Sequence, residues 1–139
     1  MKKMNSIQAT LVGMLTRMFT SKDYDNMIFA NQLSTAVKSS VEKNFPNLSV
    51  AYAAKNGAKY DLTLNDGTEV TMFRDGTVEK VERQNGAVPK SLVPGMVADA
   101  VENYFGKKQI QKLKKTPKGY FVQLSNAKSF SLDNSGCFA

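Results

Sequence analysis

The sequence contains no histidine and no tryptophan, and its single cysteine, Cys137, lies near the C-terminus. Without histidine, the chain lacks the commonest general base, the commonest zinc ligand and the simplest side chain for sensing physiological pH. A single cysteine excludes an internal disulfide. We therefore expect a protein that is not an enzyme and that binds neither a metal ion nor a cofactor.

Long hydrophobic runs are also missing, so we expect no transmembrane segment. Lys2 and Lys3 resemble the start of a secretory signal, but polar residues interrupt the apolar run that should follow. Apolar residues instead recur on one face of a helix, at Ile7, Leu11, Met14, Leu15 and Met18. We predict an amphipathic helix within residues 1–25, with a degraded signal peptide as the alternative.

What the chain does contain is a repeat. When the sequence is shifted by 60 positions, residues 33–79 (the first repeat) align without a gap with residues 93–139 (the second repeat), and eight of the 47 pairs are identical. Apolar positions also coincide, as in Val50 and Ile110 or Met72 and Leu132. The pattern predicts two copies of one supersecondary unit joined by a connector at residues 80–92. Together with a short strand from residue 27, they form one domain over residues 26–139.

Each repeat begins with helical spacing and continues with alternation. In the first repeat, apolar residues fall on one helix face up to Pro46, which ends the helix, and Ser34 is the expected cap. In the second, Pro94 is expected in the first helical turn and Gly106 at the helix end. Alternating strands follow, with Asp66-Gly67 as a predicted type I′ turn.

The sequence thus predicts an α+β fold. Two tandem repeats, each a helix followed by an antiparallel meander, form a helix-on-sheet layer. The turn motifs around Asp66 and Asp75 lack the alternating oxygens and final glutamate of a calcium loop, which agrees with the absence of a metal site.

These motifs resemble those of a known family. Three short motifs are similar to those of the PepSY-like, β-lactamase-inhibitor-like proteins of bacteria. They are Asn44-Phe45-Pro46 after the first helix, Leu64-Asn65-Asp66-Gly67 in the turn, and Tyr104-Phe105-Gly106 at the matching place in the second repeat. The resemblance covers residues 26–139. It implies a helix-on-sheet unit in tandem, a periplasmic or secreted location and a non-catalytic binding role. Because residues 1–25 are a poor signal peptide, a cytoplasmic location stays open.

One face of the predicted sheet carries the candidate site. If the helices cover one face, polar residues such as Asp61, Thr63 and Thr71 point to the other, toward solvent or a partner. Aromatic residues interrupt this polar pattern. We predict a protein-binding surface formed by Tyr52, Phe73, Phe121, Lys112 and Lys114. The alternative is that the N-terminal helix covers these aromatics.

Charge favours a second candidate function. The net charge is +7, and residues 107–118 hold six lysines without an acidic residue. Such a cluster is typical of a surface that binds an anionic polymer, either nucleic acid or acidic polysaccharide. It is also typical of an edge strand whose lysines prevent edge-to-edge pairing.

Overall fold

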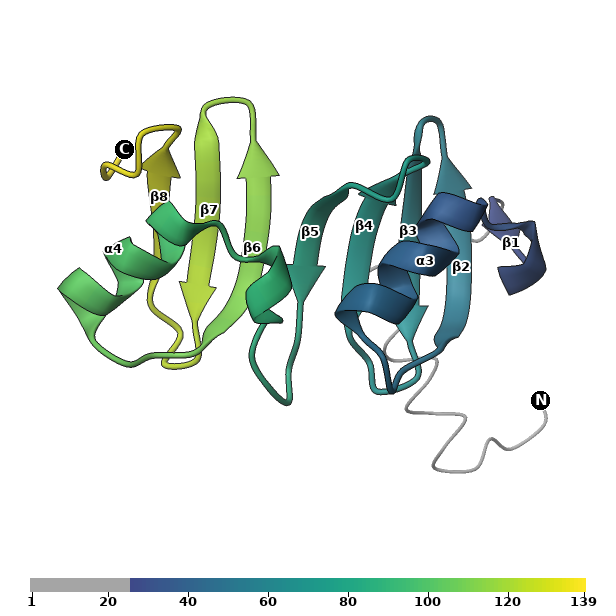
Figure 1. Ribbon diagram of the computed structural model, residues 1–139, viewed down its shortest axis with the longest axis horizontal. Coiled ribbons are helices and arrows are strands. Elements are labelled where there is room, and N and C mark those ends of the chain that lie inside the picture. Colours follow the sequence, from purple (N-terminus) through teal and green to yellow (C-terminus); the bar gives the residue numbers. More distant parts are fainter. Residues whose placement is uncertain (1–25) are drawn as a thin grey trace, which may run out of the picture.

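The computed structural model describes residues 26–139, so the helix predicted within residues 1–25 lies outside the described residues. The described residues form an α+β structure with two α-helices and eight strands (Figure 1). In chain order the elements are β1 (Met27–Ile28), η1 (Ala30–Gln32), α3 (Thr35–Asn44), β2 (Val50–Asn56), β3 (Lys59–Leu64), β4 (Glu69–Phe73), β5 (Val78–Glu82), η2 (Lys90–Leu92), α4 (Gly95–Phe105), β6 (Ile110–Thr116), β7 (Gly119–Leu124) and β8 (Ser129–Asp133).

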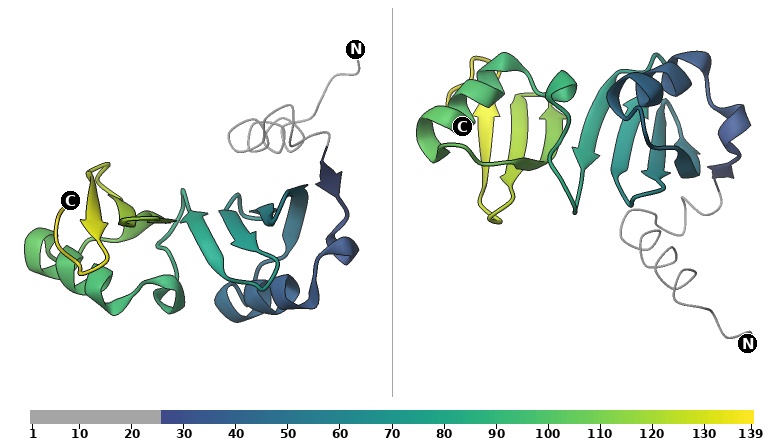
Figure 2. Two further views of the ribbon diagram at one scale, coloured as in Figure 1. Left: turned by 90° about the horizontal axis from the view of Figure 1, so that it is seen from above. Right: turned by 60° about the horizontal axis from the view of Figure 1, so that its bottom comes forward.

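All eight strands belong to one antiparallel sheet in the order in which they occur along the chain, β1 to β8. Both α-helices lie on the same face of this sheet, as the view from above shows (Figure 2). The helix-on-sheet layer that the sequence predicts is therefore present. No helix among residues 26–139 combines the length and the apolar character needed to cross a bilayer.

Local signals in the sequence set the helix ends. The Ser34 side chain caps α3 by accepting a hydrogen bond from the backbone nitrogen of Val37, at 3.2 Å. Gly106 ends α4 with a φ of 76°, which favours glycine. One expectation is corrected, because Pro94 is the residue before α4 and not part of its first turn. Its missing N–H donor costs nothing there, since a helix leaves its first donors unpaired.

The core lies between the helices and the sheet and runs through both halves of the protein as one hydrophobic cluster. Leu62, Leu64 and Met72 are fully buried in the first repeat. Their matches in the second repeat are equally buried, namely Val122, Leu124 and Leu132.

The strand register also recurs between the repeats. Ala53 pairs with Leu62 in β2–β3, and Leu113 pairs with Val122 in β6–β7. The register shifts between Val50 and Tyr52, and it shifts again at the matching place in β6. Such a bulge exchanges the faces on which the following side chains lie. The two halves thus share this irregularity as well as their regular pairing.

The two halves join where β5 pairs with β6. Three residue pairs make this ladder, and the middle one, Val81 with Leu113, is buried. On either side of it, Lys80 lies opposite Lys114 and Glu82 lies opposite Lys112. The local sequence pattern gives no indication of this pairing.

The free edges of the sheet are short. β1 contributes two residues at one edge, and a single bridge between Leu132 and Phe138 lines the other. The Phe138 ring also packs on Tyr104 of α4, with centroids 4.7 Å apart. Short, covered edges limit strand addition by other chains.

The hairpin turns correct a prediction. A type I′ turn needs two residues with positive φ, but in the Asp66-Gly67 turn only Gly67 has one, at 88°. The turn is a three-residue loop whose last residue is left-handed, and Asp66 Oδ1 accepts a hydrogen bond from the Thr68 nitrogen at 2.9 Å. At the matching place in the second repeat stands Ala127, which is the only non-glycine with positive φ among residues 26–139.

Ala127→Gly should therefore stabilise the protein by about 1 kcal/mol, because glycine adopts the left-handed conformation without the clash of a Cβ atom. Urea denaturation of the two chains measures the difference. Gly67→Ala is the matched control and should destabilise the protein. An unchanged or lower free energy of unfolding in Ala127→Gly would contradict this account of the turn.

A second matched pair tests how the hairpins pack on the helices. Gly76 and Gly136 have the same φ of 86°, but a Cβ atom at Gly76 would lie 2.6 Å from the Ala36 backbone oxygen of α3. At Gly136 the nearest atom is the Met96 Cβ, at 3.2 Å. Gly76→Ala should thus cost about 1–3 kcal/mol more than Gly136→Ala. Equal losses in thermal unfolding experiments would argue against close packing of this turn on α3.

Candidate functional site

The sheet face opposite α3 and α4 (the open face) carries every residue of the predicted binding surface. Strand pairing shows this, because residues paired across neighbouring strands lie on one face. Tyr52 pairs with Thr63, and Phe73 pairs with Lys59. In the second repeat, Phe121 pairs with Lys114, and Lys112 pairs with Gln123.

Three of these residues come together in the second repeat. The Lys112 ammonium lies 5.7 Å from the centroid of the Phe121 ring, within the range of a cation–π interaction. Lys114 is exposed, and Phe121 and Lys112 are half-buried. β5 adds Lys80, which lies directly opposite Lys114. We call these four residues the Phe121 patch.

Sequence reasoning missed Lys80. Lys80 lies in β5 next to the buried Val81 and therefore points to the opposite face of the sheet, the open face. Its approach to Lys114 depends on the pairing of β5 with β6, which joins segments that lie far apart in the sequence. The local pattern carries no signal for such a contact.

Tyr52 and Phe73 do not join this patch. They lie on β2 and β4, and strands β5 and β6 separate β4 from the strand of Phe121. Phe73 lies beside a different lysine, because the Lys59 ammonium is 5.7 Å from the centroid of the Phe73 ring. Glu79 in turn pairs with Lys59 at 2.9 Å, which balances that charge.

Of the polar residues predicted on the open face of the first repeat, Thr63 and Thr71 are buried and Asp61 is half-buried. Thr63 is 0% exposed and Thr71 is 6% exposed. The Asp61 carboxylate accepts hydrogen bonds from the Thr71 hydroxyl at 2.8 Å and from the Asn56 side-chain nitrogen at 2.7 Å. These bonds satisfy polar groups that would be costly to bury alone.

The lysines of residues 107–118 do not form one surface. Lys112 and Lys114 lie on the open face, but Lys115 lies toward the helix side, with its ammonium 5.0 Å from the Tyr120 ring centroid. Lys107 and Lys108 lie in the loop between α4 and β6, and Lys118 lies in the β6–β7 turn. The positive charge is therefore divided among separate places.

Metal ligands do not gather either. Within residues 26–139, no group of three or more aspartate, glutamate or cysteine side chains is placed to hold a metal ion.

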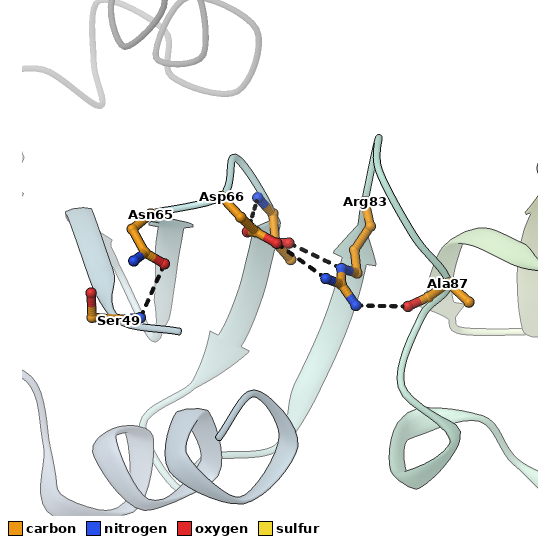
Figure 3. A network of polar contacts seen from close by, with 6 residues as sticks. Ser49, Asn65, Asp66, Arg83 and Ala87 are labelled. Atoms are coloured by element: carbon orange, nitrogen blue, oxygen red, sulfur yellow. Dashed lines mark hydrogen bonds and ion pairs between the residues drawn. The ribbon is translucent and has the colours of Figure 1, made fainter. Parts of the chain in front are cut away.

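A polar network joins the first repeat to the connector (Figure 3). The Arg83 guanidinium donates to the Asp66 carboxylate at 3.1 Å, to the Thr68 hydroxyl at 3.2 Å and to the Ala87 carbonyl at 3.0 Å. Partial burial raises the pKa of Asp66. Hydrogen bonds from Thr68 lower it, as do the hydrogen bond and the charge of Arg83, and these effects together exceed that of burial. The pKa of Asp66 therefore lies below 3.8. The network holds the connector against the β3–β4 turn, which is a structural role.

Comparison with known proteins gives the family. A sequence model described as "Putative beta-lactamase-inhibitor-like, PepSY-like" matches residues 19–80 and again residues 58–139. The chain belongs to this PepSY-like family. The first match contains α3 and the second contains α4, and the two overlap over residues 58–80, which hold β3 and β4. No curated protein matches the sequence.

Three solved structures show the same fold. A "putative periplasmic protein of unknown function" from Bacteroides vulgatus has a TM-score of 0.73 and 24% identity, over 81% of this chain and 94% of its own. A "putative calcium-regulated periplasmic protein" from Bacteroides thetaiotaomicron has a TM-score of 0.73 and 20% identity, over 84% and 96%. A second B. vulgatus "putative periplasmic protein" has a TM-score of 0.74 and 23% identity, over 81% and 92%.

The Arg83 network predicts a pH-dependent effect of Asp66→Asn. Because folding lowers the pKa of Asp66, its contribution to stability is complete above the unfolded-state pKa and disappears as the pH falls through the folded-state pKa. Asp66→Asn should cost about 0.5–1 kcal/mol at pH 7. It should cost almost nothing at a pH well below 3.8.

Urea denaturation at both pH values measures this difference. Asp99→Asn, an exposed change on α4, controls for the loss of one negative charge. A penalty for Asp66→Asn that stays constant with pH would show that charge has no part in the network.

Proposed function

We propose that this protein is a non-catalytic binding module of the bacterial cell envelope and that it binds an acidic segment of a protein through the Phe121 patch. The observation that carries the proposal is that Lys112 and Lys114 lie next to the Phe121 ring and that Lys80 lies opposite Lys114 on the same sheet face. The PepSY-like family and the names of the structural relatives support a periplasmic location.

Charge explains why the partner should be acidic. Like charges directly opposite each other on neighbouring strands destabilise a sheet, and Lys80 lies opposite Lys114. Carboxylates of a partner would offset that repulsion. Glu82 lies opposite Lys112 and partly balances its positive charge. The unbalanced positive charge is therefore centred on Lys80 and Lys114.

Phe121 explains why the partner should be a protein. An aromatic side chain gives a large contact area at low cost in conformational entropy and is often a dominant residue of protein interfaces. The Lys112 ammonium lies within cation–π range of this ring, so the patch combines an aromatic surface with positive charge. An acidic peptide with an apolar side chain satisfies both features of the patch.

We also infer that the two halves are copies of one unit and that the second has acquired the binding site. The shared register and the two family matches support the duplication. At the place of Phe121 the first repeat has Asp61, whose carboxylate is engaged by Asn56 and Thr71. Lys112 and Lys114 likewise replace Tyr52 and Ala54, so the patch exists in one copy alone.

Binding of an anionic polymer is the second candidate. It would use all six lysines of residues 107–118 as a group. Their division among the open face, the helix side and two loops gives less support to this function than the Phe121 patch gives to protein binding.

Capture experiments test the proposal. Immobilised wild-type protein, Phe121→Ser, Lys114→Glu and Lys118→Glu are each incubated with the envelope fraction of the native bacterium, and bound proteins are identified by mass spectrometry. We expect a partner that wild type and Lys118→Glu retain equally and that the other two variants lose at least about tenfold. Lys118→Glu matches Lys114→Glu in charge but lies in the exposed β6–β7 turn.

Two results would oppose the proposal. Equal losses from Lys114→Glu and Lys118→Glu would favour the anionic polymer, whose binding depends on total charge and weakens steeply with salt. A large fall in melting temperature in Phe121→Ser would show that this ring stabilises the fold rather than binding a partner.

A further inference from the structure

A groove lies between the connector and the C-terminal end of α4. Its volume is about 620 Å³, which is within the range of pockets that bind small molecules. Its floor is formed by branched aliphatic side chains that belong to the hydrophobic core, and the buried ones are Val88, Val101 and Ile110. We call it the α4 groove. A ligand that lies in it must therefore offer an apolar part.

The rim of the α4 groove is positively charged. Lys90 of η2, Lys107 and Lys108 of the loop after α4, and Glu102 of the last helical turn are all exposed there. The negative end of the helix dipole favours lysines just beyond a helix C-terminus, which accounts for Lys107 and Lys108 without a ligand. It does not account for Lys90, which belongs to the connector side. Three cations thus face one anion around an apolar floor.

The first repeat has a smaller groove at the matching place, with a volume of about 390 Å³. Most of its lining residues are 60-position matches of the α4 groove, such as Val41 for Val101. All three lysines have uncharged matches, which are Ala30, Asn47 and Leu48. Leu48 packs against the core. Because the first repeat forms the same unit without these lysines, the fold itself does not require a positive rim.

The lining favours an alkyl chain over a peptide. The aliphatic floor offers no side-chain hydrogen bond, and the backbone nitrogens of Val88, Val93, Gly106 and Lys108 already donate to carbonyl oxygens of the protein. Carbonyl groups of a bound peptide would find no donor at these four places, and burying them without one is costly. An alkyl chain needs no donor. A carboxylate at its end would accept charge-assisted hydrogen bonds from the lysines.

We propose that the α4 groove binds a medium-chain fatty acid. The alkyl chain lies on the floor of Val88, Val101 and Ile110, and the carboxylate lies at the rim beside Lys90 and Lys107. The Phe121 patch is on the opposite face of the sheet, so this second site depends neither on the patch nor on the proposed function.

Isothermal titration calorimetry of the full chain with decanoate tests the site. Lys90→Ala and Lys107→Asn each introduce the residue of the first repeat, and Lys118→Ala does the same in the exposed β6–β7 turn, where the match is Ala58. We expect wild type and Lys118→Ala to bind decanoate equally, at a single site with a Kd below about 1 mM. Lys90→Ala and Lys107→Asn should each weaken binding at least about threefold.

Chain length and location are tested with the unsubstituted protein. Hexanoate should bind at least about tenfold more weakly than decanoate, because it leaves four methylene groups fewer to bury. In NMR spectra, decanoate should shift the amide signals of Val88, Val101 and Ile110. The signal of Val41, in the groove of the first repeat, should stay in place.

Several results would overturn the proposal. They are no binding of decanoate below about 1 mM, equal affinities of Lys90→Ala, Lys107→Asn and Lys118→Ala, equal affinities for hexanoate and decanoate, and shifts centred on Phe121. Tighter binding of a short peptide that ends in leucine would identify a protein terminus as the occupant and would also contradict it.

Discussion

The pairing of β5 with β6 is the contact on which the rest of the structure depends. Each repeat is only about 50 residues long, and a unit of that size buries too little apolar surface to be more than marginally stable in isolation. Separate halves would also leave β5 and β6 as open edges. Their pairing removes both edges and places Val81 against Leu113 within one core. It also brings Lys80 opposite Lys114 and so creates the charged centre of the Phe121 patch.

The two halves of the sheet share their packing and differ on the open face. One repeat can preserve the packing of the fold while the other changes its open face, provided that the buried residues are kept. Leu62, Leu64 and Met72 have apolar matches in the second repeat, whereas Asp61 is matched by Phe121. The buried positions therefore keep their apolar character, whereas the open face changes in chemistry between the two halves. An interaction surface can arise there at little cost in stability.

Much of the fold could be predicted from the sequence because its signals are local. Ser34 and Gly106 mark helix ends through their own side chain and backbone, and alternation assigned Phe73 and Phe121 to the face opposite the helices. Two things escaped such reasoning. The left-handed turns at Gly67 and Ala127 depend on loop length, which the Asp-Gly dipeptide alone does not fix. The approach of Lys80 to Lys114 depends on the pairing of two strands that lie far apart in the chain.

Native-state hydrogen exchange tests most directly whether the β5–β6 ladder unites the halves. Amides in β3 and β4 of the first repeat should exchange with the same opening free energy as those in β6 and β7 of the second, because the sheet opens as one cooperative unit. Addition of denaturant should lower both free energies with one slope. Exchange of the second repeat at a clearly lower free energy, while the first remains protected, would contradict the account.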